Sequence, residues 1–246
     1  LGLMVALGGL VFNVGNVAGA GLGLDALLGL SPQWGGAISA VIAVGIFLSR
    51  RAGVAMDRIV VALGLVMIAM TAYVAIVSRP PLGQALRNAV LPEAIDFLAI
   101  TTLVGGTVGG YITYAGAHRL VDAGISGAAN IHAITRASVV GVLVTGLMRA
   151  LLFLAVLGVV AAGVKLSGDN PTASAFRFAA GEAGLRVFGL ILWAAALTSV
   201  IGASYTSVSF LASLHPGLET RRNGLVVGFI LVSAVVFLAV GAAPVP

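Results

Sequence analysis

Long uncharged stretches alternate along the chain with short segments that carry all but one of its charges. A transmembrane helix needs about 20 mostly apolar residues. The segment at residues 30–33 predicts a tight hairpin between the first two stretches, and residues 173–183 predict a short interfacial helix in the longest loop. The pattern therefore predicts an all-α membrane protein with seven transmembrane helices, at residues 1–24, 26–49, 59–78, 97–118, 137–164, 187–218 and 223–246.

The composition agrees with a polytopic membrane protein. Of the 246 residues, 60% are hydrophobic and 9% are charged, whereas soluble domains are about 45–50% apolar and about 25% charged. These proportions exclude a soluble enzyme and a disordered chain, and the lack of cysteine excludes a disulfide framework or a Cys-based zinc module. Both ends of the chain are apolar, so we expect residues 1–246 to be one transmembrane domain within a longer protein.

The basic residues occur singly or in pairs, as in loops that face anionic lipid, and do not indicate nucleic-acid binding. Seven of them lie around residues 50–58, 116–136 and 214–222, and five lie around residues 79–93 and 164–186. Because cytoplasmic loops carry an excess of Lys and Arg, the first group is placed in the cytoplasm.

Glycine clusters in the fourth predicted span, where Gly105, Gly106, Gly109 and Gly110 fall within six residues. Each glycine costs about 0.8–1 kcal/mol relative to alanine in a helix interior. Unwound backbone at membrane depth is tolerated where it lines a cavity, and its carbonyls can coordinate a cation. We therefore expect this span to be unwound around residues 106–110. Close helix packing through small residues is the alternative.

Two groups of polar side chains lie within predicted spans. Asn13 and Asn16 are three residues apart in the first span, so they share a helix face and need partners on other helices. Residues 198–209 of the sixth span carry Tyr205 and six hydroxyls of Ser and Thr, including Ser204 and Thr206. Either group can line a polar pathway. Alternatively, the amides hold helices together and the hydroxyls bond to carbonyls of their own helix.

Arg149 is the one charge inside a predicted span. It follows Arg136 by 13 residues, or about 20 Å along a helix, which is near the middle of a hydrocarbon core about 30 Å thick. Since arginine there costs roughly 2.5–3.5 kcal/mol or more, we expect it to face the protein interior and to contact main-chain oxygens or a hydroxyl of the sixth span. A functional role and a purely structural role are both open.

Together these features resemble the Nramp family of divalent-metal transporters. Residues 13–30, with Pro32, Trp34 and Gly35, resemble the third helix of that family and the turn that follows, and residues 50–54 resemble its next cytoplasmic loop. The Gly-Gly-Thr-Val-Gly-Gly-Tyr sequence at residues 105–111 falls where the family has Gly-Ala-Thr-Val-Met-Pro-His in an unwound sixth helix. The seven spans then correspond to helices three to nine.

The resemblance implies a LeuT-like fold of inverted repeats with a metal site at the membrane midplane. It implies substrate-binding positions at Gly106, Gly109, Gly110 and Tyr111, with backbone oxygens of Gly106 and Gly109 as metal ligands. The family has a methionine thioether at the position of Gly109. Thioethers select softer metals, whereas carbonyls and water suit hard ions.

Three further positions depart from the family pattern. Acidic residues used in proton movement are expected in the third helix, where this chain has Asn13 and Asn16. Arg149 falls near an asparagine of the seventh helix. With the lost thioether, these departures resemble the magnesium-type branch of the family.

The expected function is secondary transport of a divalent cation, magnesium or manganese, by an integral protein of a bacterial plasma membrane. This is neither an enzyme nor a cofactor-dependent protein, and its partners are the ion and the lipid bilayer. An alternative is a transporter of an amino acid or small anion with Arg149 as counter-charge, because helix N-termini and an arginine suit a carboxylate. A non-transporting membrane scaffold or sensor is the third possibility.

Overall fold

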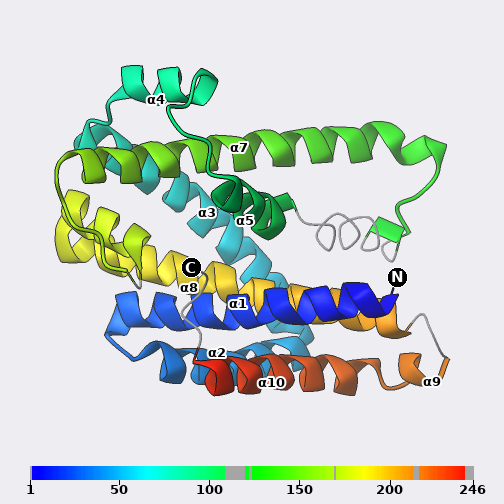
Figure 1. The fold of residues 1–246 in the computed structure, drawn as a ribbon. Helices are drawn as coiled ribbons and strands as arrows, with labels where there is room; N and C mark the ends of the chain where they lie inside the picture. Colours follow the sequence, from blue (N-terminus) through cyan, green and yellow to red (C-terminus); the bar gives the residue numbers. More distant parts are fainter. Residues whose placement is uncertain (1, 109–119, 122–123, 169, 213–215, 242–246) are drawn as a thin grey trace. The chain divides into compact units, whose positions relative to one another are not determined.

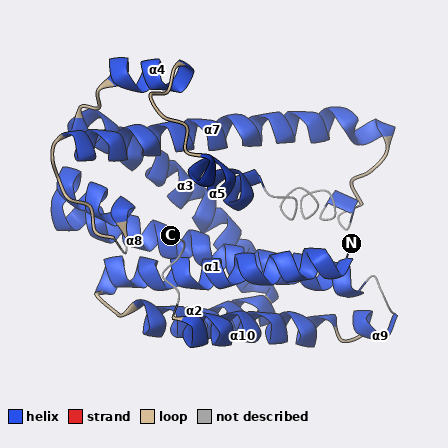
Figure 2. Cartoon of the chain, in the orientation of Figure 1, coloured by secondary structure: helices blue, strands red, loops and turns tan. Residues whose placement is uncertain are grey.

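The computed structural model describes residues 2–108, 120–121, 124–168, 170–212 and 216–241. Over these ranges the chain forms helices and connecting segments without a strand, which confirms the all-α prediction (Figure 2). The helices are α1 (Gly2–Leu28), α2 (Pro32–Leu48), α3 (Arg50–Ser78), α4 (Leu82–Val90), α5 (Phe97–Val108), η1 (Ala128–Asn130), α7 (Ile131–Ala161), α8 (Pro171–Ala212), α9 (Pro216–Glu219) and α10 (Arg222–Val240).

Five of the seven predicted spans correspond to helices that are long and apolar enough to cross a membrane. These are Gly2–Leu28, Val61–Ser78, Ala128–Ala161, Pro171–Ala212 and Arg222–Val240. Helix α2 is apolar but has 17 residues. Helix α5 has 12 residues up to Val108, and residues 109–119 lie outside the described residues. Seven spans therefore stay a prediction.

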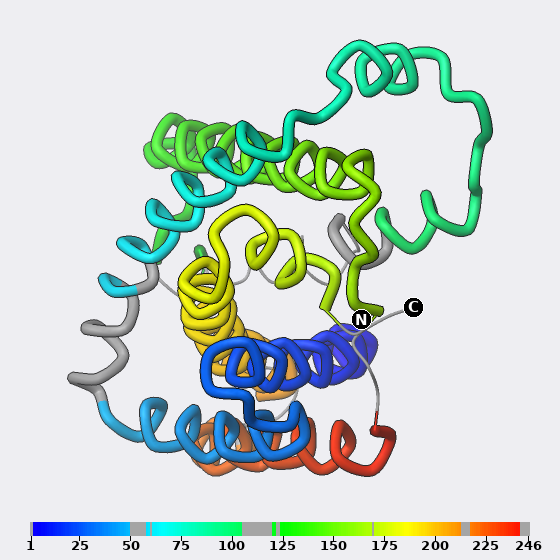
Figure 3. The backbone as a smooth tube through the Cα atoms, turned by 90° about the vertical axis from the view of Figure 1, so that its left-hand side faces the viewer, coloured from blue at the N-terminus to red at the C-terminus, as the bar shows by residue number. Residues whose placement is uncertain are grey.

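The chain divides into two compact units, Leu1–Val74 with Lys165–Pro246, and Ala75–Val164. In the first unit α1 lies alongside α8, and α2 lies alongside α10 (Figures 1 and 3). Their apolar faces share one core, because each helix must bury its apolar side chains against another element. The largest buried members of this core are Val17, Leu197, Val200, Val208, Val226, Ile230 and Phe237.

Helix α1 approaches α2 and α8 through glycines. A Cβ at Gly23 would lie 2.5 Å from the backbone nitrogen of Trp193, and a Cβ at Gly189 would lie 2.5 Å from that of Leu27. A Cβ at Gly21 would collide with the carbonyl of Pro32. These small residues let the backbones come closer than side chains would allow.

The predicted hairpin between the first two spans is confirmed. Helix α1 ends at Leu28, and Gly29 follows with a left-handed φ of +74°, a conformation that glycine adopts without a Cβ clash. Helix α2 then begins at Pro32, whose fixed φ suits the first helical position. Three residues thus reverse the chain between two packed helices.

A break divides α8 into a short and a long part. Ala180 (φ −134°, ψ 18°) and Gly181 (φ 60°, ψ −153°) are not helical. Residues 171–179 therefore form a separate short helix, which confirms the helix predicted at residues 173–183 but ends it earlier. Its Phe176 is fully buried and stacks against Phe188 of the long part, with ring centroids 4.8 Å apart. The interfacial position of this helix stays a prediction.

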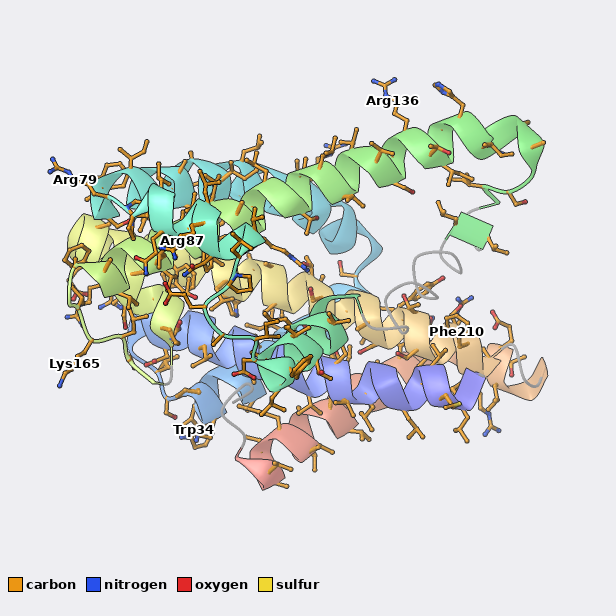
Figure 4. All side chains as sticks on the ribbon, turned by 45° about the horizontal axis from the view of Figure 1, so that its top comes forward. Trp34, Arg79, Arg87, Arg136, Lys165 and Phe210 are labelled. Carbon is orange, nitrogen blue, oxygen red and sulfur yellow. The ribbon has the colours of Figure 1, made fainter. Side chains whose placement is uncertain are left out.

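The second unit contains the end of α3, with α4, α5 and α7. Ser78 lies against Gly158 of α7, where a Cβ would come within 2.6 Å of the Cβ of Ser78. Arg79 and Arg87 lie near the end of the unit where α3 stops, and Arg136 lies toward the opposite end of α7 (Figure 4). This agrees with placing the loops at residues 79–93 and 116–136 on opposite sides of the membrane.

Unwinding of the fourth span was predicted around residues 106–110, and this prediction is wrong for residues 106–108. Helix α5 continues through Gly105 and Gly106 to Val108. An α-helix satisfies its own backbone hydrogen bonds, and in lipid this requirement outweighs a propensity cost of about 1 kcal/mol per glycine. Gly109 and Gly110 lie outside the described residues, so unwinding there stays a prediction.

Candidate functional site

Asn13 lies at the centre of a buried polar cluster in the first unit. Its side chain is fully buried on α1. The amide Nδ2 donates hydrogen bonds to Ser204 Oγ of α8 at 2.9 Å and to Ser233 Oγ of α10 at 3.0 Å. One amide therefore joins three helices at one point.

Both serine hydroxyls donate hydrogen bonds to carbonyl oxygens of their own helices. Ser204 Oγ donates to Val200 O at 2.7 Å, and Ser233 Oγ donates to Phe229 O at 2.8 Å. Each hydroxyl thus accepts from Asn13 and donates to a residue four positions earlier. The hydrogen bonds end on backbone oxygens, so burial of these polar groups is compensated.

Asn16 extends the cluster along α1. It is half-buried, and its Nδ2 donates to Asn13 Oδ1 at 3.5 Å, a long hydrogen bond. This confirms that the two asparagines share a helix face. We refer to Asn13, Asn16, Ser204 and Ser233 as the amide–hydroxyl cluster. Its four side chains are amides and hydroxyls, which neither lose nor gain a proton near neutral pH.

Ser233 is the cluster residue that the sequence analysis does not identify. It has no neighbouring polar residue and lies in the most apolar part of the last span. One feature of the sequence could have identified it, because Ser233 is the sole hydroxyl in residues 223–246. A lone hydroxyl in an otherwise apolar span needs a partner, either on its own helix or across helices.

Thr206 is buried but lies apart from this cluster. Its Oγ1 donates to Gly202 O at 2.8 Å, four residues earlier on α8. This is the local role of a helix hydroxyl that was the alternative to a polar pathway. Of the two hydroxyls proposed for the pathway, the structure therefore brings Ser204, and not Thr206, to the asparagines.

A second polar group lies at the end of α8 near Phe210 (Figure 4). The guanidinium carbon of Arg222 lies 4.5 Å from the ring centroid of Tyr205, a cation–π distance. Arg222 Nη2 donates to Ser209 Oγ at 2.6 Å, and Nη1 donates to Glu219 Oε1 at 3.1 Å. Arg222 thus connects the start of α10 to α8 and α9. The loop-charge pattern predicted only that Arg222 lies on the cytoplasmic side, and it did not predict these contacts.

Trp34 and Lys165 lie at the opposite end of the same unit (Figure 4). At this end the guanidinium of Arg186 donates to the carbonyl of Leu27, in the last turn of α1. A cation at a helix C-terminus interacts favourably with the helix dipole. Arg177 and Glu182 form an exposed ion pair across the break in α8.

Arg149 is exposed on α7, in a stretch of that helix where most residues are exposed and Met148 is half-buried. The structure therefore does not show the predicted interior contact. The hydroxyls of the sixth span belong to the other unit. Contact between Arg149 and those hydroxyls stays a prediction.

The expected metal site falls at the edge of the described chain. Gly106 is helical, and Gly109, Gly110 and Tyr111 lie outside the described residues. Among the described residues, no group of three or more His, Cys, Asp or Glu side chains could hold a metal ion. Backbone oxygens near Gly109 therefore stay the predicted ligands.

The family follows from a comparison with known proteins. All residues from 1 to 246 match the Nramp family, described as natural resistance-associated macrophage protein-like. The chain belongs to the Nramp family. This agrees with the resemblance in residues 13–35 and 105–111, and with an integral membrane protein that carries several apolar helices.

Two bacterial relatives of this Nramp chain are described as membrane proteins. It is 55% identical over 241 residues to the uncharacterized membrane protein YcsG of Bacillus subtilis (strain 168). The aligned region covers 98% of this chain and 60% of that protein. It is 50% identical over 241 residues to an uncharacterized membrane protein of Haemophilus influenzae. That aligned region covers 98% of this chain and 61% of the relative. The chain thus spans about three-fifths of the length of these relatives. No solved structure matches it.

Proposed function

We propose that this Nramp protein is a secondary transporter of a hard divalent cation, with magnesium as the first candidate. Membership of the Nramp family supports divalent-metal transport. The observation that carries the choice of ion is the sequence Val-Gly-Gly-Tyr at residues 108–111, which has no sulfur ligand at Gly109. Carbonyl oxygens and water are ligands that Mg²⁺ accepts readily, since it keeps part of its hydration shell.

The amide–hydroxyl cluster supports transport without a proton pathway at this position. Asn13 and Asn16 stand where the family resemblance implies acidic residues. Both amide protons of Asn13 are bonded to serine hydroxyls, which donate to helix carbonyls. Neither the amide nor the hydroxyls can take up a proton near neutral pH. We propose that the cluster joins helices and that the cation moves elsewhere.

Cation selectivity tests the proposed function. In proteoliposomes, we expect similar uptake of Mg²⁺ and Mn²⁺ and no preference for Cd²⁺, because a site of backbone oxygens and water offers no soft ligand. Uptake of each ion is measured with an ion-sensitive dye inside the vesicles, and protein-free vesicles serve as the control. A strong preference for Cd²⁺ would contradict an oxygen-only site.

A second candidate function is transport of an amino acid or another small anion. It is favoured by the exposed Arg149 on α7, which forms no ion pair with a described residue. A guanidinium binds a carboxylate through paired hydrogen bonds, whereas it repels a cation held within about 4–6 Å. The two candidates therefore require opposite contributions from Arg149.

Substitution of Arg149 separates these candidates. With Arg149→Asn, we expect cation flux to survive or rise because a like charge is removed, and we expect anion or amino-acid flux to collapse because the counter-charge is lost. Arg136→Asn, near the start of the same helix, is the matched control. Abolished cation flux in a folded Arg149→Asn protein would show that Arg149 is part of the cation machinery.

A further inference from the structure

Helix α4, Leu82–Val90, exposes an apolar face. At 3.6 residues per turn, Leu82, Leu86 and Val90 lie on one side of the helix, Gln84 lies on the other, and Arg87 lies at the flank of the apolar side. The three apolar side chains are 54%, 71% and 79% exposed, and no residue of α4 is buried. Helix α4 also packs extensively against none of the other described elements. The described residues of this unit therefore leave this face uncovered.

The position of α4 along the chain places it at the edge of the membrane. The candidate span Val61–Ser78 ends three residues before α4 begins. Three extended residues reach at most about 10 Å. Pro80 and Pro81 cannot continue the preceding helix, and Arg79 adopts a positive φ of 48° at the turn. The chain thus changes direction at the end of a transmembrane helix, and α4 cannot move far from that end.

Charge in this segment matches a lipid surface. Residues 79–91, which include α4, carry Arg79 and Arg87 and no acidic residue, and the acidic Glu93 and Asp96 follow after the helix. Both arginines lie near the end of the unit where α3 stops (Figure 4). Basic residues beside a membrane are attracted by anionic head groups, and the aliphatic part of arginine can lie along the acyl boundary while its guanidinium reaches the phosphates.

We propose that α4 lies in the non-cytoplasmic interface of the bilayer. Leu82, Leu86 and Val90 enter the boundary between head groups and acyl chains, and Arg87 lies on the water side among the lipid phosphates. An exposed apolar face with basic residues beside it is typical of an interfacial amphipathic helix, and the connection of three residues keeps α4 near the end of a membrane span. The occupant of the face is therefore lipid, and not a second protein.

Single-cysteine labelling tests this placement, because the chain contains no cysteine. Leu82→Cys, Leu86→Cys and Val90→Cys are labelled with an environment-sensitive fluorophore in vesicles of phosphatidylcholine and phosphatidylglycerol. Gln84→Cys on the opposite face and Arg87→Cys at the flank are the controls. We expect blue-shifted emission and loss of fluorescence with brominated lipids for the first three, and quenching by aqueous iodide for the two controls.

Three outcomes would overturn the proposal. Equal iodide quenching at all five positions would place α4 in water. Protection of the Leu86→Cys label from both iodide and brominated lipid would show that protein covers the apolar face. An unchanged Leu86→Cys signal when phosphatidylglycerol is omitted would remove the role of charge. All five residues are at the surface, and two further positions on the apolar face report independently if one variant fails to fold.

Discussion

Asn13 shows how a single polar residue can stabilise a bundle of apolar helices. A buried amide without partners costs roughly 1–3 kcal/mol, but this amide bonds to hydroxyls on α8 and α10. Between membrane helices such bonds contribute about 0.6 kcal/mol on average and at most about 1.7 kcal/mol. The contribution of Asn13 is therefore modest in energy, but it fixes three helices at the same height.

Replacement of Asn13 measures this contribution. We expect Asn13→Ala to lower the free energy of unfolding by about 1–2 kcal/mol, because two interhelical hydrogen bonds are lost. Asn16→Ala is the matched control on the same face, and its effect is smaller because Asn16 is half-buried and its bond is long. Unfolding in detergent, followed by circular dichroism, gives both values. Equal losses would contradict the central role of Asn13.

The sequence predicted part of the site at the residue scale. The shared face of Asn13 and Asn16 follows from helical spacing alone, and Ser204 was among the expected polar residues. Spacing within one helix carries no information about which other helix faces it, so Ser233 could not be identified. The predicted interior position of Arg149 depended on an energetic cost at the membrane midplane, which does not specify a partner.

At the scale of the elements, the close approach of α1 to α8 predicts unequal effects of the same substitution. Gly23→Ala is expected to destabilise the protein by about 1–3 kcal/mol, because the new Cβ would lie 2.5 Å from the backbone nitrogen of Trp193. At Gly15 of the same helix, no atom lies within 4 Å of the new Cβ. Gly15→Ala should be neutral or stabilising, since alanine favours a helix by about 0.8–1 kcal/mol. The thermal unfolding midpoints of the two variants test this difference. Equal midpoints would contradict the close packing of α1 against α8.

Helix positions were more predictable than helix interruptions. Hydrophobic length located α1, α8 and α10, since an apolar run of sufficient length has few other stable conformations in lipid. Glycine content predicted unwinding from Gly106 onward, but α5 stays helical to Val108, because propensity is a weak determinant against complete backbone hydrogen bonding. The break at Ala180 and Gly181 follows from the fold of a short helix onto Phe188, a tertiary contact that local composition does not encode.

At the scale of the whole molecule, loop charges predict sidedness, and the first unit allows a direct test. Ser31 lies between α1 and α2, and Thr220 lies between α9 and α10 at the other end of the same bundle. Ser31→Cys should react with a membrane-impermeant maleimide on intact cells. Thr220→Cys should react only after permeabilisation, because the Arg221–Arg222 pair places it in the cytoplasm. The reverse pattern would invert the orientation, and the unsubstituted chain is the control for background labelling.

The division into two units was not predictable from the sequence. Hydropathy and loop charge are similar in residues 1–74 and 75–164, and both signals describe each helix against lipid and water rather than against its neighbours. The family resemblance, in contrast, was carried by residues 13–35, 50–54 and 105–111, and it is confirmed over the whole chain.

The contact between α1 and α8 also determines how these helices can move. At Gly23 and Gly189 the two backbones leave no room for a Cβ. A shift of α1 by one helical turn, about 5.4 Å, toward its own N-terminus would bring Leu27 to the position of Gly23 and cause a steric clash, whereas the opposite shift would bring Gly19 there. Sliding of α1 past α8 is therefore blocked at this contact in one direction. A conformational change of the protein that moves these two helices along each other can proceed at this contact only in the other direction.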